Sequence, residues 1–136
     1  MKNLIAAIMT KCADSDLSNY VGGRIYIDEA EQKAEFPYVV FKIISSAPES
    51  TFTEEFTDTL LQASLFSTSD SVVEIMTMDE YLNALFDECD LTITGSTLIW
   101  MRRTNLVTMT DSLTTENGQR TLRHWAEDYE IKTSLN

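Results

Sequence analysis

An amphipathic pattern marks the first part of the chain. Its apolar stripe at helical spacing consists of Leu4, Ile5, Ile8, Met9 and Cys12. This spacing predicts a helix over residues 2–13. We expect residues 17–21 to continue the packing, until Gly22 and Gly23 allow a sharp reversal of the backbone.

A second helical stripe runs through residues 71–89. Its apolar positions are Val72, Ile75, Met76, Leu82, Leu85 and Phe86. Ser71 and Glu74 have the S-x-x-E spacing of a capping box, so we expect the helix to begin there. We also expect Met76 and Met78 to lie in the core, as methionines on an apolar helix face usually do.

The other apolar segments have the composition of strands. Residues 24–27 are a short strand, and residues 38–44 form an unbroken apolar run introduced by Pro37, as in a strand buried on both faces. Further strands are expected over 56–67, 91–94, 97–103 and 120–133, with 105–111 prolonging the fifth strand or starting a bend.

Three polar segments separate these elements, and we expect all three to be loops: 28–35, 45–55 and 111–119. The resulting order is α-β-β-β-α-β-β-β. It predicts a single α+β domain over residues 1–136, with a largely antiparallel, curved sheet and two helices packed on one of its faces.

Composition narrows the class of protein. With 136 residues, 43% of them apolar and 24% charged, the chain has the makeup of one folded domain. Ten basic residues face 22 acidic ones, which gives a formal net charge of -12. Such a charge repels a phosphate backbone, so direct nucleic-acid binding is disfavoured.

No catalytic or cofactor-binding signature occurs in the sequence. Cys12 and Cys89 are far apart and predict buried, reduced thiols, not a zinc site. The one histidine, His124, lies in a predicted strand, where we expect a surface or sheet-packing role. Phosphate-binding, zinc-protease and EF-hand motifs are absent. We therefore expect no enzyme, no cofactor and no metal.

Several phrases of the sequence follow one another in a recognisable order. They are LIAAIM, GGRIY, FPYVVFKIIS, DTLLQASLFS, SVVEIMTMDEYLNALF and HWAEDYEIKTSL. Together they cover nearly the whole chain, and they resemble the tail-completion, or tail-terminator, proteins of long-tailed bacteriophages and prophages. The resemblance lies in the pattern of elements and includes no catalytic fingerprint.

This resemblance implies a structural virion protein, made in the host cytoplasm. Such a subunit forms a ring, usually hexameric, on the head-proximal end of the tail tube. The ring ends tube polymerisation and offers the surface that joins the head connector. The implied partners are other copies of the chain, the tail tube protein and the connector protein. DNA passes through the lumen without specific binding, and no membrane is involved.

Interface positions are selected from the residues themselves, because the resemblance supplies none. The candidates for a subunit or partner interface are Arg24, Asp28, Glu29, Glu31, Glu54, Glu55, Arg102 and Arg103. Most of them lie in or beside the polar segments, where binding residues concentrate. Arg102 and Arg103 are the only adjacent basic pair, and we expect them to form salt bridges with acidic residues of another subunit.

Two other functions fit part of the pattern. A head-completion or stopper protein of the virion neck shares the size and the class of partner. An acidic inhibitor that mimics DNA would share the charge, but it requires carboxylates spaced like phosphates on one face. Here the acids are spread through every predicted loop.

Overall fold

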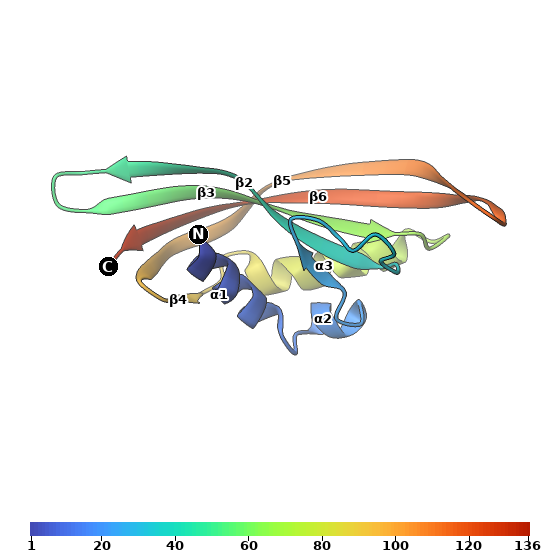
Figure 1. Ribbon diagram of the computed structural model, residues 1–136, viewed down its shortest axis with the longest axis horizontal. Helices are drawn as coiled ribbons and strands as arrows, with labels where there is room; N and C mark the ends of the chain where they lie inside the picture. The colour runs from blue at the N-terminus through green and yellow to red at the C-terminus, as the bar shows by residue number, and fades with distance from the viewer.

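Helices cover one face of a twisted sheet and leave the other face bare (Figure 1). The computed structural model describes residues 1–136. Its helices are α1 (Lys2–Cys12), α2 (Asp16–Tyr20) and α3 (Val73–Phe86). Its strands are β1 (Ile25–Ile27), β2 (Tyr38–Ser50), β3 (Glu55–Ser67), β4 (Thr92–Ile93), β5 (Ser96–Thr115) and β6 (Gly118–Leu135).

The six strands form one sheet in the order β1-β2-β3-β6-β5-β4. Only β1 and β2 run parallel, and every other neighbouring pair is antiparallel. The predicted α+β class and the predicted order of elements are therefore confirmed. The addition is α2, a single short helix capped by the Ser15 hydroxyl, which accepts a hydrogen bond from the Ser18 amide at 3.1 Å.

The core lies between the helices and the face of the sheet that they cover. Alternate positions of the central strands point into it, which is the period expected of strands with one buried face. Leu61 and Leu65 of β3 and Ile131 of β6 are fully buried there. Phe86 of α3 contacts the rings of Phe41 and Tyr129 edge to face, with centroids 5.5 and 6.3 Å away.

The prediction of a loop is wrong for two of the three segments, because most of their residues lie in strands. Residues 45–50 continue β2, and residues 111–115 continue β5. Both prolong hairpins in which polar residues replace apolar ones, and threonine, one of these residues, is enriched in strands. The turns themselves are short, over 51–54 and 116–117, and the hairpins point to opposite ends of the molecule (Figure 1). The third segment, 28–35, is a loop as predicted.

The start of α3 also differs from the prediction. The helix begins at Val73, and Ser71 accepts a hydrogen bond from the Val73 amide at 3.2 Å, so no capping box forms. Glu74 instead accepts a hydrogen bond from the Ser67 hydroxyl at 2.6 Å, which ties the first turn of the helix to the end of β3. The carboxylate is used for tertiary contact and not for capping.

The sulfur-containing side chains on and near the helices differ in how deeply they are buried. Met78 is fully buried, whereas Met76 is 46% exposed, so its predicted place in the core is wrong. Cys12 is buried as predicted, and burial raises the pKa of its thiol to about 12. Cys89 is only half-buried. No helix combines the length and the apolar composition that crossing a membrane requires.

The two methionines of α3 provide a matched test of this packing. Met78→Ala removes a fully buried side chain and should lower the free energy of unfolding by about 2–5 kcal/mol. Met76→Ala makes the same chemical change on the exposed side and should cost less than about 0.5 kcal/mol. Urea denaturation followed by circular dichroism measures both. Equal losses for the two variants would contradict the placement of α3.

Candidate interaction surfaces

Aromatic side chains form a row across the helix-free face of the sheet. Tyr38 of β2, Phe66 of β3 and His124 of β6 are register neighbours, and their rings stack with centroids 4.7 and 4.2 Å apart. Met109 of β5 lies opposite His124 and extends the row. Such cross-strand pairs stabilise a sheet by about 0.2–1 kcal/mol each. The sheet-packing role predicted for His124 is confirmed, and burial lowers its pKa.

The loop after β1 overhangs one end of this row. Asp28 and Glu29 border a hollow of about 260 Å³, whose floor includes Tyr38, Lys42 and Phe66. Two of the predicted interface residues therefore meet the aromatic row, and a third, Glu31, is exposed in the same loop.

The Arg24 side chain forms hydrogen bonds to the end of the same loop. Its guanidinium donates hydrogen bonds to the carbonyl oxygens of Pro37 at 3.0 Å and Phe36 at 3.4 Å. The side chain is half-buried. These contacts join the start of β1 to the start of β2, so they give Arg24 a role in positioning the loop.

Glu54 and Glu55 lie at the other end of β2. Glu54 is in the turn of the β2–β3 hairpin, where its amide donates a hydrogen bond to the Thr51 hydroxyl at 3.0 Å. Both glutamates are exposed. They are separated from Asp28, whose amide bonds to the Phe41 carbonyl, by the part of β2 from Phe41 to Ser50, so the predicted acidic positions do not form one cluster.

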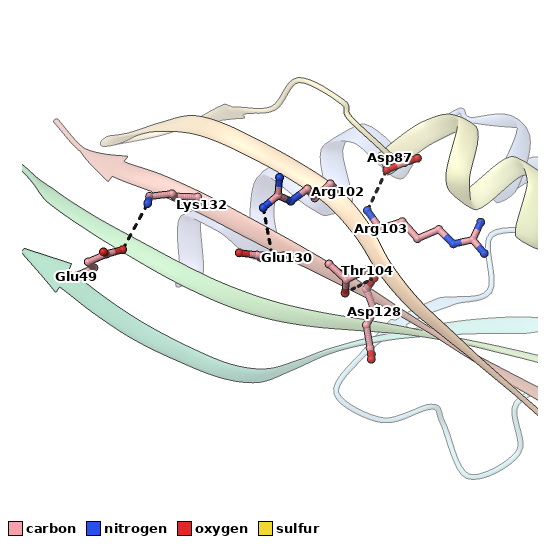
Figure 2. A network of polar contacts seen from close by, with 8 residues as sticks. All are labelled: Glu49, Asp87, Arg102, Arg103, Thr104, Asp128, Glu130 and Lys132. Carbon is pink, nitrogen blue, oxygen red and sulfur yellow. Dashed lines mark hydrogen bonds and ion pairs between the residues drawn. The ribbon is translucent and has the colours of Figure 1, made fainter.

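Arg102 points to the helix-free face, where it joins a set of paired charges (Figure 2). Its guanidinium lies 3.6 Å from the Glu130 carboxylate and 4.7 Å from the centre of the Trp100 ring. Lys132 lies 3.4 Å from Glu49 and 5.0 Å from the same ring. Exposed pairs of this kind contribute about 0–1 kcal/mol each. Their main effect is to balance the positive charges of this face with carboxylates.

Arg103 points to the opposite face, toward α3. Its backbone amide donates a hydrogen bond to Asp87 at 2.9 Å, which ties β5 to the end of the helix (Figure 2). Its guanidinium forms an ion pair with Glu127, a fully buried residue of β6. Both arginines are thus paired within the chain, and the salt bridges to another subunit stay a prediction.

Glu127 is the one acid placed in the core. Burial raises the pKa of its carboxyl to about 8, Asp79 of α3 adds to the rise, and Arg103 opposes it. Nearby, the Tyr129 hydroxyl donates a hydrogen bond to the Asn83 side chain, and burial raises the pKa of Tyr129. The result is a polar contact between α3 and the centre of the sheet.

Sequence reasoning missed Glu127, although a signal was present. Trp125, Glu127, Tyr129 and Ile131 share one phase of the strand, and the aromatic and aliphatic members of this set face the helices. An acid in the same phase must enter the core. A charge there needs a partner, because an isolated buried carboxylate is costly.

No three side chains of histidine, cysteine, aspartate or glutamate are grouped to hold a metal ion. The largest hollow, about 410 Å³, lies beside α1, and its charged lining residues are Lys11 and Asp90. The features that distinguish this molecule are therefore surfaces: a bare sheet face, two projecting hairpins and an exposed acidic loop.

These features define a small α+β subunit of assembly type. Residues 4–132 match the model of the family "Tail completion protein gp17", and the chain belongs to this family. It is accordingly a tail structural protein, and the resemblance noted in its sequence is confirmed.

Solved structures share the fold. A chain in the virion of a native gene transfer agent particle is 15% identical, aligns with a TM-score of 0.74 and covers 95% of this chain and 92% of its own. A second solved structure is 14% identical, has a TM-score of 0.56 and covers 96% and 94%. No curated protein matches the sequence at a significant level.

The buried carboxylate generates a pH prediction. Because the pKa of Glu127 is higher in the folded state than in the unfolded state, the folded state binds more protons between about pH 4.5 and 8. This group's contribution to stability is therefore present at low pH and is lost as the pH rises to 8. Glu127→Gln should raise the free energy of unfolding at pH 8.5 by about 1–3 kcal/mol.

Urea denaturation of wild type and variant from pH 5 to 8.5 measures the difference between them. Glu130→Gln is the matched control, since it is the same change on the same strand at a partly exposed position. That control should keep the wild-type slope of stability against pH. A Glu127→Gln variant with an unchanged slope would show that the carboxyl is not buried as described.

Proposed function

We propose that the protein closes the head-proximal end of a tail tube as a ring of identical subunits, ends tube polymerisation and presents the surface that joins the head. The family match over residues 4–132 is the observation that carries this proposal. Its partners in this role are other copies of itself, the tail tube protein and the head–tail connector protein. We expect no catalytic activity and no cofactor.

The shape of the subunit supports assembly into a ring. A closed ring is built from head-to-tail contacts, in which each subunit offers two different patches that fit one another. The sheet has two unlike margins, β1 with β2 on one side and β5 with β4 on the other. Each subunit can therefore contact two neighbours through different strands.

The charge of the subunit supports passage of DNA through such a ring. The chain carries a net charge of -12, which repels phosphates. Arg102 and Lys132 on the helix-free face are each within reach of a carboxylate, so they do not form an unopposed basic patch. DNA that passes this face would meet paired charges and would not be held.

The acidic candidate residues suit two different partners. Asp28, Glu29 and Glu31 lie in the loop before β2, and Glu54 and Glu55 lie at the far turn of the same strand. If the strands run roughly along the ring axis, one group faces the tube and the other faces the connector. Arg24 contributes by holding the loop in place.

The alternatives are separated by genetics. The family match favours completion of the tail over the head-completion or stopper role and over a DNA-mimic inhibitor. Without its gene, a phage-like particle should show overlong or unjoined tails by electron microscopy. Heads that leak DNA beside tails of normal length would indicate a stopper. Normal joined particles would remove both neck functions.

The oligomeric state tests the ring directly. Light scattering of the purified protein over a range of concentration and salt should give about six times the mass of one chain. Negative-stain images of the same sample should show closed rings with a central hole. A strict monomer under all conditions, with no rings when tail tubes are added, would contradict the proposal.

A further inference from the structure

The outer edge of β5 is largely without a neighbour. β4 pairs only with Ser96 and Thr97, although β5 continues to Thr115. The inner edge is paired with β6 along its length, and residues 87–88 bond the outward Met101 carbonyl and Arg103 amide. Beyond Arg103 the outer edge presents unused backbone donors and acceptors. Beyond the last β3–β6 pair, at Ser67 and Arg123, the hairpin is a ribbon of only two strands. Such ribbons are marginal alone and gain stability from a third strand.

A register irregularity between Arg103 and Asn105 marks the start of this open edge, and beyond it the edge lacks charges, proline and glycine up to Thr110. The stretch 104–110, TNLVTMT, contains no charged residue, proline or glycine, in a chain of which 24% is charged. Val107 and Met109 are 45% and 42% exposed. Soluble proteins normally protect an edge strand with charges, proline or bulges, because an open edge pairs with other chains. An edge this bare is suited to a partner strand.

The opposite margin of the sheet offers a second open edge. β1 covers β2 only at 39–41, so the outer edge of β2 is free from Ile43 onward. Residues 43–47, IISSA, carry no charge, and Ile44, which lies in the register irregularity between Ile43 and Ser45, is 45% exposed. Pro48 then ends the stretch, since proline has no amide donor.

β1 itself is a poor partner strand. It has three residues, and turns at its ends use two of its outward groups. The Ile25 amide donates to the Gly23 carbonyl, and the Ile27 carbonyl accepts from the Glu29 amide, both at 2.9 Å. The open part of this margin is therefore β2.

We propose that the outer edge of β5 in one copy pairs antiparallel with the outer edge of β2, over residues 43–47, in the next copy. The inference rests on the proposed ring and names the strands that close it. Within the sheet, β2 and β5 run in opposite directions, because three antiparallel pairings separate them. Repeating the subunit about an axis roughly along the strands thus brings β5 antiparallel to β2 of the neighbour.

The two open edges lie at different heights, which predicts a stagger. Through the register, Ile43 of β2 is level with Arg103 of β5, and Ser50 is level with Ser96. The uncharged stretch 104–110 lies farther toward the β5–β6 turn. Neighbouring subunits must therefore shift along the strands by several residues. Strands that close into a barrel are tilted and staggered in this way.

Paired cysteines test the contact. In a Cys89→Ala background, with the buried Cys12 left in place, Ser45→Cys is combined in turn with Val107→Cys, Met109→Cys or Asp111→Cys. All four positions point to the helix-free face. Mild oxidation of the ring should give a ladder of covalent multimers on a non-reducing gel for at least one combination. Ser45→Cys with Thr108→Cys is the control, since Thr108 points to the opposite face and should give at least about tenfold less product.

Any of the following outcomes would contradict the pairing of β5 with β2 of the next copy. Rings seen by light scattering that give no ladder with any combination would sink this contact while leaving the proposed function standing. A covalent dimer from Met109→Cys alone would show that β5 pairs with itself. A ladder from Tyr26→Cys with Val107→Cys would assign the contact to β1. Wild-type protein that forms no ring, alone or with tail tubes, and gives no ladder would count against both the contact and the ring.

Discussion

The pairing of β3 with β6 is the constraint on which the rest of the structure depends. These strands join two hairpins, β2–β3 and β5–β6, over twelve consecutive pairs from Phe56 with Ser134 to Ser67 with Arg123. Their register sets which side chains face the helices, and the buried apolar positions of both strands meet there. A slip of one residue would move the apolar set of one strand, such as Ile131 of β6, to the bare face while Leu61 and Leu65 of β3 stay against the helices. In the observed register, the apolar side chains of both strands form the one face on which the helices pack.

The same register explains the assembly surfaces. The hairpins overlap along nearly the whole of β3, their turns lie at opposite ends of the molecule, and the sheet ends in two unlike margins. Arg102 and Lys132 on the bare face are paired with carboxylates, whereas residues 43–47 of β2 and 104–110 of β5 are uncharged. Glu127 is the exception inside, where Arg103 and Asn83 offset part of the cost of a buried carboxylate. The surfaces that this fold provides are the bare face, the two hairpin turns and the outer strand edges.

Much of the fold follows from the sequence, and the failures have physical reasons. Apolar periodicity located α1, α3 and the central strands. It failed at 45–50 and 111–115, since strands exposed on both faces need no apolar alternation. The Asn117-Gly118 pair was the available hairpin signal. Charged residues were a poor guide to interfaces, because Arg24, Arg102 and Arg103 are engaged within the chain, and open edges depend on which strands become neighbours.

The role that we propose for this chain is to form the ring between tail tube and head. Electron cryomicroscopy of intact particles, with the subunit fitted into the neck density, tests it most directly. We expect one closed ring of copies at the head-proximal end of the tube, with β5 of each copy beside β2 of the next. Density for this subunit only elsewhere in the particle, or single copies that make no contact with each other, would contradict it.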